Sequence, residues 1–153
     1  MKITTKTRSA FRAINQTTAQ NVGPADLTAI EYPDELFDLN NEYNPSTSTF
    51  TPKHNGVYLI IASLGFFANV PTSYSVRIFI AINGTLRVAD NDFLGEELAI
   101  VNLVSASSIL QLSAGDAVQV FAQATTDGTT VPEPLENTVH FMNFEAARFP
   151  SPW

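Results

Sequence analysis

The 153-residue chain has the length of one ordinary domain, and a chain of this size can bury well over half of its unfolded surface in a single core. Its 8 basic and 15 acidic residues give a formal net charge of −7, and no run of Lys or Arg offers a track for a phosphate backbone, which argues against a nucleic-acid partner. The absence of cysteine excludes disulfides, Cys-ligated zinc and thiol catalysis.

Neither a signal peptide nor a membrane span is expected in the chain as given, because the start lacks ~7 successive apolar residues and nowhere do ~18 run together. Apolar residues make up 44% of the chain and charged residues only 15%. This low charged fraction suggests that some apolar surface is buried between subunits.

Abundant β-branched and aromatic residues, turn residues about every 8–12 positions and little helical periodicity predict an antiparallel, all-β domain. In chain order, strands are expected at residues 9–15, 36–38, 47–52, 56–68, 74–82, 85–90, 97–112, 117–124 and 138–148. Residues 16–34 and 125–136 are polar and should be mostly loop. We expect one domain over residues 1–153, with its core at residues 9–148 and short tails at both ends.

Two short polar segments are expected to be turns. Asn83 and Gly84 both tolerate a positive φ, which predicts a type I′ turn and a hairpin between the flanking strands. Asp90, Asn91 and Asp92 should form the next turn. Their alternating oxygen ligands make Asp90 and Asp92 a candidate calcium site, although the Gly and the terminal Glu of a dedicated calcium loop are missing. No other cofactor is expected.

Three predicted strands, at 56–68, 97–112 and 138–148, carry apolar side chains on both faces. The other long strands have one more polar side, which includes Arg77, Arg87, Gln119 and Gln123. A sandwich of these two kinds of sheet has a spare apolar surface, and another copy of the chain is the simplest cover for it. The alternative is that these are central core strands with tolerated exposed apolar residues.

Several spaced residues resemble the pattern of the globular head of complement component 1q, within the superfamily that includes tumour necrosis factor. They are Tyr32, Asp38, Tyr43, Phe50, Gly56 and Tyr58. Tyr32 stands where Phe is usual, and Ile60 and Ala62 replace aromatic residues. The segments LQLSAGDAVQV (110–120), VHFMNFEAARF (139–149) and SAFRAINQ (9–16) also resemble strands of that family.

The segments FTPKHNGVYLIIAS (50–63) and INGT (82–85) are similar to the bacterial, cysteine-free members found on spore-surface collagen-like glycoproteins of bacilli. The resemblance implies a two-sheet antiparallel jelly-roll sandwich of about ten strands. It also implies a tight homotrimer, an extracellular or cell- or spore-surface location, and work by surface recognition or by trimerising a stalk.

Catalysis has little support in the sequence. His54 falls in a turn and His140 within the last predicted strand, so a hydrolytic triad is not favoured. The acidic residues lie mainly in loops of a negatively charged protein, where solvated carboxylates are commoner than glycosidase pairs. We therefore expect a module that is not an enzyme.

The favoured hypothesis is a homotrimer with a possible protein or glycan ligand on its outer surface. The residues expected to line the trimer are Leu59, Ile61, Val101, Leu103 and Phe144, although the sequence does not reveal which face of each strand points to the axis. A monomeric jelly-roll carbohydrate-binding module is the alternative, and it should show an aromatic platform on the more polar sheet. A phage or capsid jelly roll shares the same fold.

Overall fold

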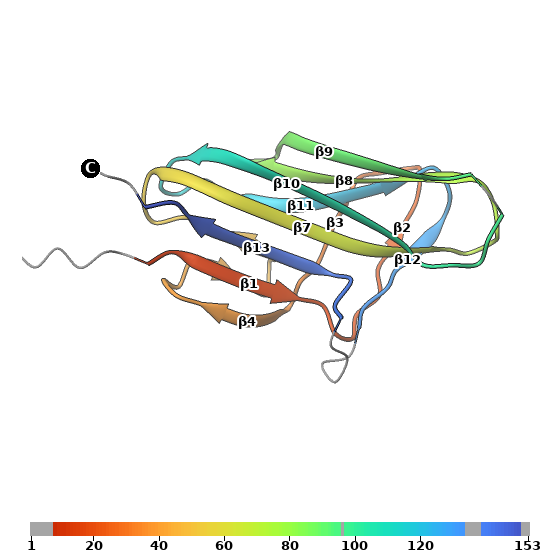
Figure 1. Cartoon of the computed structure of the whole chain (residues 1–153), viewed down its shortest axis with the longest axis horizontal. Helices are drawn as coiled ribbons and strands as arrows, with labels where there is room; N and C mark the ends of the chain where they lie inside the picture. Colours follow the sequence, from red (N-terminus) through yellow and green to blue (C-terminus); the bar gives the residue numbers. More distant parts are fainter. Residues whose placement is uncertain (1–7, 96, 134–138, 151–153) are drawn as a thin grey trace, which may run out of the picture.

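The computed structural model describes residues 8–95, 97–133 and 139–150, which form two packed antiparallel β-sheets (Figure 1). This part of the chain contains no helix, and hence none that could span a membrane. The all-β sandwich predicted from the sequence is confirmed. Its strands outnumber the expected ten because several span only two or three residues.

The strands are β1 (Ala10–Ile14), β2 (Asn21–Val22), β3 (Thr28–Ala29), β4 (Asp34–Asp38), β5 (Tyr43–Asn44), β6 (Thr49–Phe50), β7 (Gly56–Ala68), β8 (Tyr74–Ile82), β9 (Thr85–Leu94), β10 (Asn102–Leu112), β11 (Val118–Ala124), β12 (Gly128–Thr130) and β13 (Asn143–Arg148). The first sheet has the order β2-β12-β7-β13-β1-β4. In addition, β10 pairs with β7 along the edge that faces away from β12 and β13. The second has the order β5-β6-β11-β8-β9, and β3 pairs with β11.

Alternation along the strands fills the space between the sheets. On β7 the core side carries Tyr58, Ile60, Ala62, Leu64 and Phe66, all of which are completely buried. At the end of the sandwich where β7 begins, aromatic rings pack into one cluster, the aromatic end cluster: Phe11, Tyr32, Tyr43, Phe50, Tyr58 and Phe144.

The aromatic end cluster contains four residues of the family pattern, so that pattern marks packing. Phe11 stacks on Tyr43 with ring centroids 4.4 Å apart. The Tyr43 hydroxyl donates to the Tyr32 carbonyl at 2.6 Å, which satisfies a buried polar group. Burial raises the pKa of Tyr32 and of Tyr43 far above the usual range, so both hydroxyls stay neutral donors.

The hairpin between β8 and β9 turns at the predicted Asn83-Gly84 pair. Both residues have positive φ, 52° and 77°, as a type I′ turn requires. The predicted turn at Asp90 to Asp92 is wrong, because β9 continues to Leu94 opposite Tyr74 at the start of β8. The edge strand therefore tolerates polar residues that a central strand would exclude.

Other boundaries also differ from those predicted. The loop expected at 16–34 contains the short strands β2 and β3, and the loop expected at 125–136 contains β12. The apolar stretch expected at 97–112 becomes a strand only from Asn102. The last strand begins at Asn143 rather than 138, a position outside the described residues, so His140 precedes it.

Candidate functional site

The first candidate surface is the outer face of the seven-stranded sheet. Ile109 on β10 lies opposite Leu59 on β7, Leu59 lies opposite Ala147 on β13, and Ala147 lies opposite Ala10 on β1. These four residues form an apolar row across the sheet, the Ile109 band. Ile109 is 61% exposed, so this row ends in a projecting side chain at the edge of the sheet.

A second apolar row, the Leu103 band, crosses the same face near the other end of β7. Leu103 lies opposite Gly65 and is 53% exposed. A side chain at Gly65 would meet Phe141 at 3.2 Å and Val101 at 3.3 Å, so both pack over this glycine. The Leu103 band consists of Leu103, Val101, Phe141 and the exposed Phe67.

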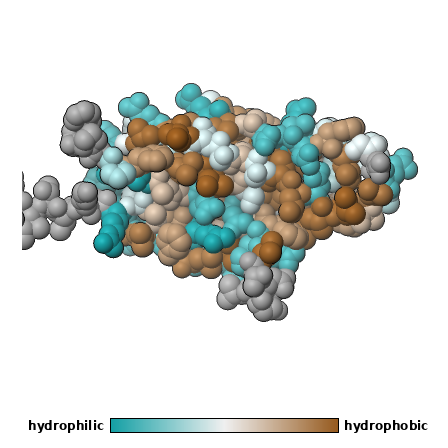
Figure 2. All heavy atoms as spheres, viewed as in Figure 1, coloured by the Kyte–Doolittle hydropathy of each residue, from teal (hydrophilic) through white to brown (hydrophobic). Residues whose placement is uncertain are grey.

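Polar side chains lie between the two bands. Ser63 has Ser105 on one side and Asn143 on the other. Arg12 donates to Asn143 Oδ1 at 2.7 Å, and its Nε lies 3.7 Å from Glu145 Oε2. This polar belt comprises Ser63, Ser105, Asn143, Arg12 and Glu145, and Figure 2 shows hydrophilic residues between hydrophobic areas on this face.

A hollow of about 220 Å³ lies on this face, over β1, β7 and β13. Leu59, Ile61 and Ala147 line it, and Phe37 of β4, 43% exposed, lies at its side. The hollow extends from β7 across β13 and β1 to Phe37 of β4, and Ile109 lies beyond its β7 side, on the free edge strand β10.

The structure separates the predicted trimer-lining residues into two groups. Leu59 and Ile61 point outward and are half-buried, and Val101 and Leu103 are exposed on the same face. Phe144 was wrongly placed with them. It lies opposite Ala62 and Ala13, both core residues, and is itself completely buried in the aromatic end cluster. Its neighbours on β13, Asn143 and Glu145, take the outward positions.

Asp90 and Asp92 lie on β9, where alternation places them on one face opposite Ile78 and Val76. Both are exposed. Among the described residues, no group of three or more His, Asp or Glu side chains could hold a metal ion. The calcium site at these two residues thus stays a prediction from the sequence.

The two histidines contribute backbone carbonyls to the structure. The His54 carbonyl accepts a hydrogen bond from the Tyr58 hydroxyl at 2.8 Å. The His140 carbonyl accepts from Asn143 Nδ2 at 2.5 Å. These contacts hold the chain just before β7 and β13, which is a structural use of both residues.

The outer face of the six-stranded sheet is less polar than predicted. Phe121 on β11 lies directly opposite Phe79 on β8, and both are half-buried. The next row pairs Gln123 with Arg77. Two half-buried rings offer less exposed area than the aromatic platform expected of a carbohydrate-binding module.

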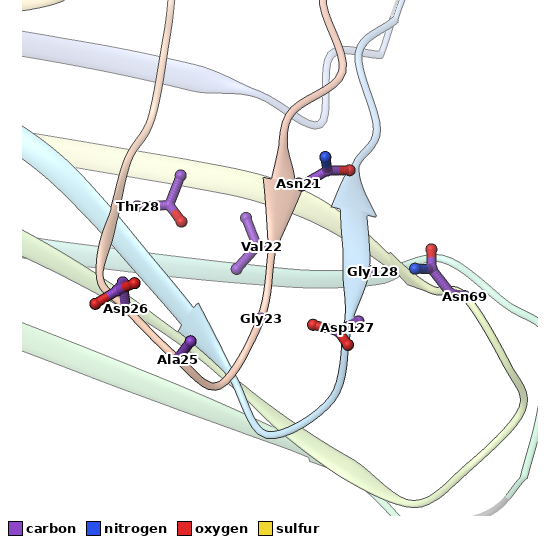
Figure 3. Close-up of a pocket in the computed structure, with 9 residues that line it drawn as sticks. All are labelled: Asn21, Val22, Gly23, Ala25, Asp26, Thr28, Asn69, Asp127 and Gly128. Carbon is purple, nitrogen blue, oxygen red and sulfur yellow. The ribbon is translucent and has the colours of Figure 1, made fainter.

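A second candidate site, which the sequence analysis missed, is a pocket of about 430 Å³ at the end of the sandwich opposite the aromatic end cluster. Five polar side chains line this Asp127 pocket: Asn21, Asp26, Thr28, Asn69 and Asp127. Figure 3 shows Asp26 and Thr28 on one side of Gly23, and Asp127 and Asn69 on the other. The residues come from the segments around β2 and β3, the loop after β7, and the start of β12. No contiguous sequence motif therefore identifies this pocket.

The two antiparallel sheets and the aromatic end cluster define the jelly-roll class of all-β domains. A C1q domain model matches residues 10–144, and the chain belongs to the C1q domain family. No curated protein matches the chain.

Solved structures that share the fold include the following three. The globular domain of zebrafish complement 1qA protein superposes with a TM-score of 0.63 at 16% identity, covering 94% of this chain and 98% of its own. Eiger TNF from S. frugiperda gives 0.66 at 13% identity, with 95% of each chain covered. Murine APRIL gives 0.66 at 12% identity, with 93% and 99% covered.

Proposed function

We propose that this domain is a homotrimeric binding or structural module of an extracellular or cell-surface assembly, and that it is not an enzyme. The observation that carries the proposal is the outer face of the seven-stranded sheet, with its two apolar bands. A face of this kind on a lone subunit leaves large apolar side chains in water, whereas contact with another copy removes them from it. Membership of the C1q domain family supports the same assembly.

The placement of the projecting and hollow parts favours a ring over a twofold dimer. In a twofold contact the same patch meets itself, whereas a head-to-tail contact joins two different patches and closes into a ring. Ile109 projects at the β10 side of the face, and the hollow beside Phe37 lies toward the β4 side. Ile109 of one copy can enter the hollow of the next, and repetition around a threefold axis closes the ring.

The polar belt supports specificity of this contact. An interface of apolar bands alone would allow neighbours to slide along the strands, whereas Ser63, Asn143 and the Arg12–Glu145 pair must meet polar partners or water. The polar belt thus fixes the position of each copy relative to its neighbour along the strand direction. Obligate contacts of this kind bury upward of about 2,000 Å².

Light scattering on the dilute protein tests the assembly. We expect a mass about three times the 16.7 kDa of one chain. Leu103→Asp should lower that mass, because an unpaired carboxylate would be buried between copies. Leu86→Asp, at an exposed apolar position on β9, is the matched control and should keep the parent mass. A folded, stable monomer of the parent protein would overturn the proposal.

Cross-linking tests the head-to-tail geometry, and the cysteine-free chain is a clean background for it. The double variant Ile109→Cys with Phe37→Cys should oxidise to a covalent trimer. Each interface would then join the cysteine at position 109 of one copy to the cysteine at position 37 of the next. The single variants should stay uncross-linked. A single variant that forms a covalent dimer would indicate a twofold contact and contradict the ring.

A further inference from the structure

The Asp127 pocket is lined by polar side chains that have no hydrogen-bond partner in the described chain. None of the side chains of Asn21, Asp26, Thr28, Asn69 and Asp127 hydrogen-bonds or ion-pairs with another described part of the chain. Some side chains of the same types are engaged elsewhere in the described chain. Asn15, for example, donates to the Thr18 and Glu31 carbonyls. The donors and acceptors of these five side chains are therefore available to a ligand from outside the chain.

Backbone contacts hold the walls of the pocket in place. Asn69 N donates to the Asp127 carbonyl at 3.0 Å, which ties the loop after β7 to the start of β12. Gln123 Nε2 donates to the Pro24 carbonyl at 3.1 Å, and Gly128 pairs with Val22 across β12 and β2. The frame is thus fixed while the side chains that line it remain unpaired, which is the arrangement of a preformed ligand site.

Gly23 shapes the floor of the pocket. A Cβ atom at this position would overlap Asp127 Oδ1, so the absence of a side chain leaves the space that the carboxylate occupies. Figure 3 shows Asp127 directed toward Gly23. The backbone of Gly23 does not have a positive φ, so its value here lies in the space that it leaves.

The lining sets the chemistry of the ligand. Amide and hydroxyl groups supply donors, carboxylates supply acceptors, and this mixture suits vicinal hydroxyls, each of which both donates and accepts. No basic residue is among the described residues that line the pocket, and the chain carries a net charge of −7, so an anionic ligand would be repelled. We propose that the Asp127 pocket binds a polyhydroxylated ligand that carries a positive charge, such as an amino sugar.

Amide NMR spectra of the 15N-labelled protein test this, with D-glucosamine, D-glucose and D-glucuronate added separately. Glucosamine should shift the resonances of residues 21–28, 69 and 127–128, and it should bind at least about tenfold more tightly than glucuronate, because its ammonium pairs with the carboxylates. Dissociation constants in the millimolar range are expected for a few solvent-exposed hydrogen bonds.

Two variants test the residues. Asp127→Asn removes one charge and should weaken glucosamine binding about tenfold, with glucose binding changed much less. Gly23→Ala should weaken it by displacing the carboxylate without altering its charge. Glu35→Gln is the control, since it removes an exposed carboxylate on β4, and it should leave binding unchanged. Thermal unfolding and light scattering should show parent-like folding and assembly for all three.

Four results would overturn the proposal: glucuronate binding as tightly as glucosamine, shifts centred on Phe79 and Phe121, Asp127→Asn binding like the parent, or no shift with any sugar. Calcium chloride alone shifting the pocket resonances, with no sugar effect, would also overturn it and identify a cation site. Because assembly is measured separately, failure here leaves the proposed trimer standing.

Discussion

Two carboxylates at the end of the sandwich where β7 begins are held by hydrogen bonds, whereas the two carboxylates of the Asp127 pocket at the opposite end have no partner in the described chain. Asp38 Oδ2 accepts hydrogen bonds from the backbone N–H groups of Glu42 and Tyr43. Glu42 is buried and accepts from Ser9 Oγ and Lys53 N. Asp26 and Asp127 at the other end make no such bonds within the described chain.

In this fold, the carboxylates that stabilise the structure and the carboxylates proposed to bind a ligand lie at opposite ends. Buried carboxylates with several donors hold the turns that surround the aromatic end cluster, and the spaced pattern shared with the family runs through this end. The carboxylates of Asp26 and Asp127 have no such partners and are available to the proposed ligand. Family membership can thus be recognised from one end of the molecule, while the proposed ligand would bind at the other.

The largest effect should come from breaking the aromatic end cluster. Phe144→Ala removes a completely buried ring that contacts Phe11 and Tyr32, and should lower the free energy of unfolding by about 3–5 kcal/mol. Urea unfolding measures this loss. Because Phe144 faces the core, the variant that remains folded should keep the parent mass. A folded variant that dissociates would contradict this placement.

A matched pair of charge removals compares the two ends directly. Glu42→Gln replaces one acceptor oxygen with a donor group among hydrogen-bond donors and should lower the free energy of unfolding by about 2 kcal/mol. Asp127→Asn, which disturbs no internal hydrogen bond, should change it by less than about 0.5 kcal/mol. Equal losses in urea unfolding would remove the distinction between the ends.

The smallest effect concerns acid stability at a third place, the turn before β11. Asp116 accepts hydrogen bonds from Ser113 N and Asn83 Nδ2, and these, together with the charge of Arg87, lower its pKa. A lowered folded-state pKa stabilises the fold above the unfolded value of about 3.9, and this contribution disappears as the pH falls through the folded value.

Thermal unfolding of the parent protein and of Asp116→Asn between pH 7 and pH 2 measures this contribution. The difference in melting temperature should be small, because Asp116 is only half-buried and solvent screens its charge, and the difference should shrink as the carboxylate is protonated. A difference that grows toward low pH would contradict a lowered pKa of Asp116 in the folded state.

The long elements could be predicted because their signals are local. The ranges of β7 and β8 follow from apolar alternation, and the turn between β8 and β9 follows from the backbone tolerance of Asn83 and Gly84. Strands such as β2 and β12 are too short for any periodicity to appear. The polar end of β9 resembles a turn because its extension depends on pairing with β8, which is a tertiary interaction.

The sites were less accessible from the sequence. Four of the five residues expected to line a trimer lie on the outer face of the seven-stranded sheet. Phe144 does not, because both sides of β13 carry apolar residues and only the pairing with β1 and β7 sets which side is inward. The Asp127 pocket gathers side chains from segments more than forty residues apart. Nothing in the local pattern around Asn69 or Asp127 distinguishes them from ordinary loop residues.

Two of the open strand edges of the sandwich, β9 and β10, are protected to different degrees. The edge strand β9 carries Arg87, Asp90 and Asp92, and charges of this kind discourage another strand from adding to it. The edge strand β10 has no charge and no proline in its 11 residues. If the proposed trimer covers β10, each newly made subunit exposes an unprotected strand edge, onto which a strand of another chain could add, until it assembles.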